Sequence, residues 1–178
     1  MDARRLVFTV GNISTADIFG TSDITGDGRT QFMNWSSLTH GHFDYAADSR
    51  GFTSGAAVEW FWDDWTLRAG RFLQPKESNG LKLDYRIFKR YGDQFEVERR
   101  HLLGGRPGVV KAFAFRNVAH MASFKDALAA AVPAAVPTLD VARRPQSKIG
   151  WGISFEQSLS SDVRVLARGG SHDGKTES

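Results

Sequence analysis

The sequence predicts an all-β fold, namely an antiparallel up-and-down transmembrane β-barrel to which this chain contributes about seven strands. Apolar and polar side chains alternate along segments of about ten residues, a length that lets a tilted strand cross a bilayer. The connections between these segments are alternately long and short, as in barrels with tight turns at one rim and long loops at the other. A soluble β-rich domain that buries its aromatic face remains the alternative, although soluble strands are usually about 5–6 residues long.

The composition excludes several classes of protein. The chain has 178 residues, a net charge of +3 and no cysteine. Disulfide scaffolds, thiolate metal sites and cysteine nucleophiles are therefore excluded. Basic residues are scattered rather than clustered, which argues against a nucleic-acid partner. No run of about 18 apolar residues occurs, so no membrane-spanning helix is expected.

The clearest hairpin covers residues 52–74. A turn at Asp63 and Asp64 places Trp62 opposite Trp65, and on the other face it places Glu59 opposite Arg68. One face of this hairpin is then aromatic and the other is small and charged. In a barrel, the aromatic face meets lipid and the charged face lines a water-filled lumen.

The remaining elements follow from the same alternation of side chains. A long irregular connection is expected at 15–51, with a short helix around 30–38, and a second connection at 75–90. Two turns of helix are expected at 123–131, before Pro133. The other strands are predicted at 4–14, 91–103, 109–121, 147–159 and 163–170.

Two positions fit this scheme poorly. If Phe113 and Phe115 face lipid across a turn at 104–108, Arg99 falls on the lipid face as well. We expect a bulge, a different register or a protein-covered surface there. Arg71 also falls on the aromatic face, and a bulge at Gly70 that turns Phe72 outward would relieve this misfit.

An odd number of strands is unusual for a barrel. Bacterial single-chain barrels have even strand numbers, and an open sheet in a bilayer would leave backbone groups unpaired. We therefore expect residues 1–178 to be a partial barrel domain, truncated at both ends and lacking a signal peptide.

The run GHFDYAADSRGFTSGAAVEWFWDDWTLRAGRFLQPKESNGLKLDYRIFKRYGDQFEVE, together with LVFTVGNISTADIF and QFMNW, resembles the carbohydrate-selective porin (OprB-type) family. The resemblance extends over about residues 4–170 and is densest at 43–98. It implies a barrel of about sixteen strands. It also implies passive diffusion of small sugars through the outer membrane of a Gram-negative cell. The partners would be sugars and outer-membrane lipid, with a homo-oligomer possible.

Candidate site residues follow from strand parity and loop composition. The charged residues expected to line the lumen are Glu59, Arg68, Glu96, Glu98, Arg116, Glu156, Arg164 and Arg168. Loop residues that would contact sugar if the loop folded inward are Trp35, Tyr45, Asp48 and Arg50. Two alternatives stay open: cross-strand ladders that stiffen the wall, and a loop that packs only at the rim.

Enzymatic and metal chemistry are not expected. Ser78-Asn79-Gly80 matches the motif of outer-membrane phospholipases, but Lys76 occupies the position of their catalytic histidine. The pair His40 and His42 is a weak metal signal. We expect no cofactor, no metal and no enzymatic activity, with a structural or enzymatic barrel as the alternative function.

Overall fold

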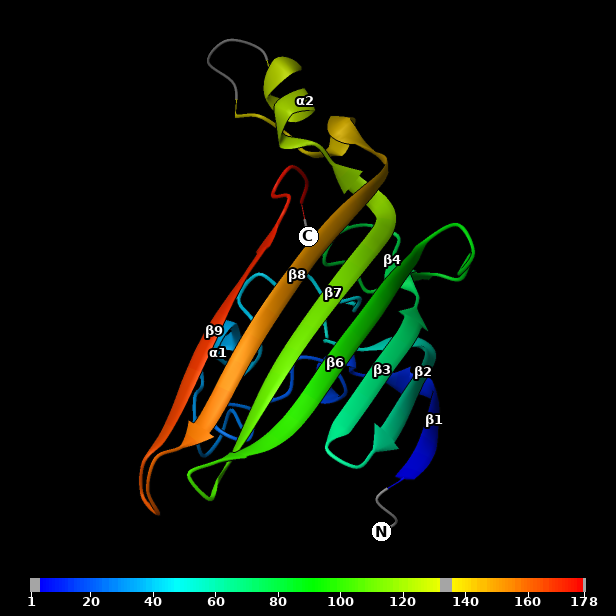
Figure 1. Ribbon diagram of the computed structural model, residues 1–178. Helices are drawn as coiled ribbons and strands as arrows, with labels where there is room; N and C mark the ends of the chain where they lie inside the picture. The colour runs from blue at the N-terminus through cyan, green and yellow to red at the C-terminus, as the bar shows by residue number, and fades with distance from the viewer. Residues whose placement is uncertain (1–3, 132–135, 178) are drawn as a thin grey trace.

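The computed structural model describes residues 4–131 and 136–177, except for the side chain of Trp35. Seven strands form one antiparallel sheet in which neighbours in sequence are also neighbours in space (Figure 1). The predicted up-and-down all-β fold is confirmed, and the sheet is open, with β1 and β9 as its edges. The strands are β1 (Arg4–Ile13), β2 (Thr53–Trp62), β3 (Trp65–Phe72), β6 (Tyr91–Leu103), β7 (Arg106–Ala122), β8 (Arg143–Ser158) and β9 (Arg164–His172).

The smaller elements lie in the long connections. Two short helices are α1 (Trp35–Leu38) and α2 (Phe124–Ala129), which confirm the two regions where helix was expected. Two 3₁₀ turns and a two-stranded ladder complete the described elements: η1 (Thr15–Asp17), η2 (Asp140–Ala142), β4 (Gln74–Pro75) and β5 (Leu83–Asp84). None of the helices in the described part of the chain is long and apolar enough to span a membrane.

Short and long connections lie at opposite ends of the sheet. The turns after β2, β6 and β8 lie at the same end as the N-terminus, and the longer connections lie at the other end (Figure 1). Gly104 and Gly105 form a two-residue turn with φ of 59° and 75°. Backbone of this kind twists with the strands that it joins, and glycine adopts it without a steric cost.

The two faces of the sheet differ sharply in exposure. The outer face carries large apolar side chains that stay exposed, with Phe8 at 71%, Trp62 at 47% and Trp151 at 53%. The aromatic face is therefore not buried by the described part of this chain. Part of the inner face is covered by the segment at residues 14–52, here called the inner loop, which lies behind the sheet in Figure 1.

The register of β2 and β3 is the predicted one, with Trp62 opposite Trp65 and Glu59 opposite Arg68. The expected bulge at Gly70 is wrong, because the pairing runs unbroken to Phe72. Phe72 points inward and is fully buried. Arg71 does face outward, where Asp93 neutralises it across a 2.6 Å ion pair.

The register of β6 and β7 differs from the simple sequence expectation. The turn consists of two residues, so Glu96 pairs with Phe113 and Glu98 with Lys111. An odd shift in register exchanges the faces of a strand. Phe113 and Phe115 therefore lie on the inner face beneath the inner loop. The same shift corrects the prediction for Arg116, which is exposed on the outer face.

Candidate functional site

The inner loop is seated on the inner face by aromatic packing. The Phe43 ring lies 4.9 Å from the Phe113 ring and 5.5 Å from the Phe115 ring, measured between centroids. Phe19, from the start of the loop, meets Phe72 edge-on at 6.0 Å. These rings form the buried apolar cluster, so the main core of this chain lies between its own loop and its own sheet.

Glycines on β8 and β9 make room for this loop. A Cβ atom at Gly170 would lie 2.0 Å from Nε2 of His42, and one at Gly152 would lie 2.9 Å from the same nitrogen. The absence of side chains at these two positions therefore lets the His42 ring approach the strands. We call the part of the inner face formed by Gly152, Gly170, Phe113 and Phe115 the seat of the loop.

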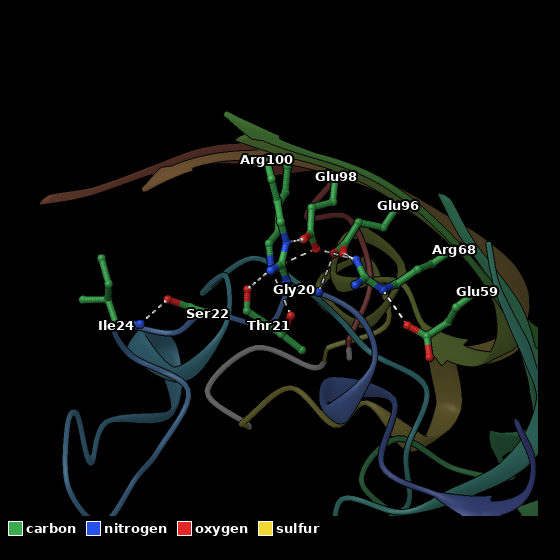
Figure 2. Close-up of polar contacts among 10 residues, drawn as sticks. Gly20, Thr21, Ser22, Ile24, Glu59, Arg68, Glu96, Glu98 and Arg100 are labelled. Atoms are coloured by element: carbon green, nitrogen blue, oxygen red, sulfur yellow. Dashed lines mark hydrogen bonds and ion pairs between the residues drawn. The ribbon is translucent and has the colours of Figure 1, made fainter. Parts of the chain in front are cut away.

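Figure 2 shows a network of charged side chains on the inner face. It lies next to the aromatic packing, since Glu96 pairs in register with Phe113. Arg68 is at its centre: its guanidinium contacts carboxylate oxygens of Glu59 at 2.8 Å, Glu96 at 2.7 Å and Glu98 at 2.8 Å. Glu98 also pairs with Arg100 at 3.0 Å and with Lys111 at 3.4 Å. Three carboxylates thus face three cations, and the formal charges of the network cancel.

The network holds the beginning of the inner loop. The backbone N–H of Gly20 donates to Glu96 at 2.6 Å. Lys111 donates to the carbonyl of Thr21 at 2.8 Å and to its hydroxyl at 3.0 Å. Glu96 is fully buried. An ionised carboxylate in that position requires such charge-assisted partners.

The later part of the inner loop is held by three other strand residues. Arg168 donates to the backbone carbonyls of Ser37 and Thr39. Asn117 donates to the carbonyl of Asp44 at 2.6 Å, and Lys148 pairs with the Asp44 carboxylate at 3.0 Å. The loop is therefore fixed to the inner face on β6, β7, β8 and β9.

His40 lies in this seat without becoming charged. Its ring centroid is 4.6 Å from that of Phe113 and 5.3 Å from that of His42. Burial, together with the nearby Arg168, His42 and Lys111, lowers the pKa of His40 to about 4. His40 is therefore neutral at pH 7.

A hollow of about 540 Å³ remains between the inner loop and the short-turn half of the inner face. We call it the polar hollow. Its volume falls within the range of about 300–1,000 Å³ that is usual for small-molecule pockets. Charged side chains supply much of its lining: Asp23, Asp64, Arg68, Glu98, Arg100, Lys111, Glu156 and Arg164.

Glu156 is a buried side chain in the lining of the polar hollow with one oxygen that makes no hydrogen bond to the described residues. Its side chain is only 5% exposed, and its Oε1 accepts no hydrogen bond from the described residues. It pairs in register with Leu166, so Arg164 and Arg168 lie on its two diagonals, as predicted. Buried acceptors are normally satisfied by protein, water or ligand, so this oxygen is available to a hydroxyl donor.

The structure separates the predicted strand residues into three groups. Glu59, Arg68, Glu96 and Glu98 lie on the inner face, as strand parity predicts, and form the network that holds the loop. Glu156, Arg164 and Arg168 also lie on the inner face, where the first two line the polar hollow and Arg168 holds the loop. Arg116 forms the third group: it was predicted on the inner face and lies on the outer face.

The predicted loop residues are mostly engaged within the loop. Asp48 is buried and accepts hydrogen bonds from the backbone N–H groups of Arg50 and Phe52. Its ion pair with the exposed Arg50 measures 2.6 Å and lowers the pKa of the Asp48 carboxyl. Tyr45 is half-buried beside Phe43. Trp35 begins α1, and its side chain lies outside the described part of the structure.

Lys111, Asn117 and Lys148 were missed by the sequence predictions. A two-residue turn at Gly104 and Gly105 places Lys111 opposite Glu98. Had that turn been assumed, the sequence would have predicted Lys111 as a residue of the inner face. Asn117 and Lys148 contact Asp44, which is far from both in sequence. No local sequence pattern therefore predicts these contacts. Within residues 4–131 and 136–177, no group of three His, Asp or Glu side chains is placed to bind a metal ion.

Comparisons with known proteins support the fold. No protein-family model matches the chain, and no curated protein matches it. Among solved structures, OprB of Pseudomonas putida is similar, with a TM-score of 0.69 and 18% sequence identity. The likeness covers 96% of this chain and 43% of the OprB chain, so the chain spans under half of that protein. The chain has the fold of part of a porin β-barrel.

Proposed function

We propose that this chain forms part of a passive, carbohydrate-selective channel in the outer membrane, with its inner face and inner loop lining the path of the sugar. The observation that carries the proposal is the inner loop, held across the polar face of the sheet by buried charges. We expect such a loop to narrow the lumen of the complete barrel. The exposed apolar outer face suits lipid, and the fold shared with OprB supports a channel rather than an enzyme.

The polar hollow is the proposed place of sugar contact. Sugars present many hydroxyl groups, each able to donate and to accept hydrogen bonds. Glu156 offers a free acceptor, and Arg164 offers donors at the exposed end of the same hollow. Binding in a channel has to stay weak enough for release, and a half-open hollow with few direct partners satisfies that requirement.

Liposome swelling tests this function. The protein, in the full length that its gene encodes, is reconstituted and challenged with hexoses and with uncharged non-sugar solutes of the same size. Faster entry of the sugars is expected. No sugar entry, or entry governed by solute size alone, would contradict a sugar-selective channel.

A variant pair assigns the selectivity to the polar hollow. Glu156→Gln removes the carboxylate without changing its size, and we expect it to reduce the preference for sugars over matched solutes. Arg116→Gln, on the outer face, should leave that preference unchanged. Equal effects of the two substitutions would rule out the polar hollow as the selective contact.

A further inference from the structure

A short row of charges crosses the otherwise apolar outer face. Arg71 pairs in register with Asp93, and Asp93 pairs with Arg116, so the three side chains occupy neighbouring strands at one level. The next outward-facing level toward the short turns carries Ala69, Phe95 and Ala114 in the same register. Side chains at directly opposed positions are within contact distance of one another. The row therefore forms one compact patch, the outer charged row.

The outer charged row has one positive charge in excess. Both carboxylate oxygens of Asp93 accept hydrogen bonds from Arg71, at 2.6 and 2.7 Å. The Arg71 guanidinium also lies 4.1 Å from the ring centroid of Tyr91. The hydrogen bond that the structure shows for Arg116 goes to a neutral group, the hydroxyl of Ser147 at 3.3 Å. Arg116 thus carries the excess charge and is exposed.

The position of the row suggests what neutralises Arg116. The row lies six residues beyond Trp65 along β3, toward the long connections, which is about 20 Å along the strand and about 15 Å across the membrane at a tilt of 35–45°. That level is beyond the middle of an apolar band about 25 Å tall. An arginine on the lipid face of a barrel is most costly at the midplane and costs little near the interface. At that level the long Arg116 side chain can extend toward the nearer interface, where the anionic headgroups of lipids begin.

We propose that Arg116, supported by the neighbouring Arg71 and Tyr91, binds the phosphate headgroup of a membrane lipid in the leaflet on the long-connection side. This inference rests on the proposed outer-membrane location. Arginine suits the ligand because its planar guanidinium can donate two parallel hydrogen bonds to a phosphate. Arg71 donates hydrogen bonds to both carboxylate oxygens of Asp93. The charge of Asp93 is therefore paired, which reduces its repulsion of a phosphate.

Lipid binding to the detergent-purified protein tests the proposal. Native mass spectrometry is used to titrate a diphosphorylated lipid A and the same lipid without phosphates. The intact protein should prefer the phosphorylated lipid, and Arg116→Gln should weaken that binding by about tenfold, the effect of one lost charge-assisted contact. Equal affinity for the two lipids, or no effect of Arg116→Gln, would overturn the proposal.

Arg99→Gln is the matched control. Arg99 is an exposed arginine on the same outer face, but it lies at the short-turn end, over the Trp65 ring at 5.1 Å. Its substitution should leave the preference for phosphorylated lipid intact, and an equal loss in both variants would overturn the assignment to Arg116. Inorganic phosphate should not displace the lipid at equal concentration; full displacement would identify a general anion site and overturn the lipid assignment.

Sugar flux measured on the same preparations separates this inference from the proposed function. A protein that prefers phosphorylated lipid but passes no sugar would contradict the sugar channel and leave the lipid site supported. A protein that passes sugar but shows no lipid preference would contradict the lipid site alone. Arg116→Gln should pass sugars at the rate of the unchanged protein.

Discussion

Arg68 illustrates how one residue holds several parts of the site together. It forms ion pairs with Glu59, Glu96 and Glu98, and the last two of these carboxylates are buried. Glu96 in turn holds the Gly20 amide. One cation on β3 therefore links the wall of the sheet to the start of the inner loop.

Replacing Arg68 tests that role. Arg68→Met leaves buried carboxylates short of a counter-ion and should destabilise the fold by about 3–5 kcal/mol. The matched variant Arg4→Met breaks an ion pair with Asp63 at the turn after β2, where the two side chains are 68% and 51% exposed, so a much smaller loss is expected. Urea unfolding in detergent measures both. Equal losses would show that the Arg68 network contributes no more than a surface pair.

His40 makes the seat of the inner loop sensitive to pH. Its pKa is lowered to about 4 in the seated loop, whereas a released loop takes up its proton near the ordinary value. The packing of the loop on its seat is thus fully stable above about pH 6.5 and loses stability as the pH falls toward 4. The total loss of free energy is about 3 kcal/mol, since each pKa unit corresponds to 1.36 kcal/mol.

Hydrogen exchange of the amides at residues 36–45 measures this effect. After correction for intrinsic rates, protection should be lower at pH 5 than at pH 7. His40→Gln should remove most of the difference, because the substituted side chain does not titrate. An unchanged pH dependence in that variant would mean that another group controls the seat.

At the scale of elements, the inner loop depends on glycines in the strands beneath it. Gly170→Val places a Cβ atom 2.0 Å from the present position of His42 Nε2, so the ring and its loop must move. A cost of about 1–3 kcal/mol is usual for overpacking of this kind. We expect faster proteolysis of the loop and a larger ion conductance.

The neighbouring glycine provides a control for that substitution. A Cβ atom at Gly169 meets nothing within 4 Å, so Gly169→Val adds the same side chain on the opposite face of the same strand. It should leave both proteolysis and conductance unchanged. If both variants behaved alike, a general effect on β9 rather than displacement of the loop would be responsible.

The strands and their faces were largely predictable from sequence, but one register was not. Alternation predicted β2 and β3 together with their pairing, because the Asp63-Asp64 turn has few alternatives. Three glycines at 104–108 allowed several turns between β6 and β7. The actual two-residue turn moved Phe113 inward and Arg116 outward. The position of the loop could not be predicted, because it depends on contacts such as that between Gly20 and Glu96. These residues are far apart in sequence, and no local pattern relates them.

At the scale of the whole molecule, the sheet has an apolar outer face, a polar inner face and a loop that covers part of the inner one. This is the arrangement of a barrel wall with its apolar residues outside and its polar residues around a lumen. The central claim is therefore that water lies on the inner side, at the polar hollow, and lipid lies on the outer side.

Thiol labelling with current recording tests that claim most directly. The chain has no cysteine, so Arg164→Cys on the inner face and Phe95→Cys on the outer face each add a single thiol to it. The full-length protein, with any other cysteine replaced, is placed in a planar bilayer and treated with a charged, membrane-impermeant thiol reagent. The reagent should modify Arg164→Cys and reduce its ion current, and it should leave Phe95→Cys unmodified. Rapid modification of Phe95→Cys, or unchanged current after modification of Arg164→Cys, would contradict a channel lined by the inner face.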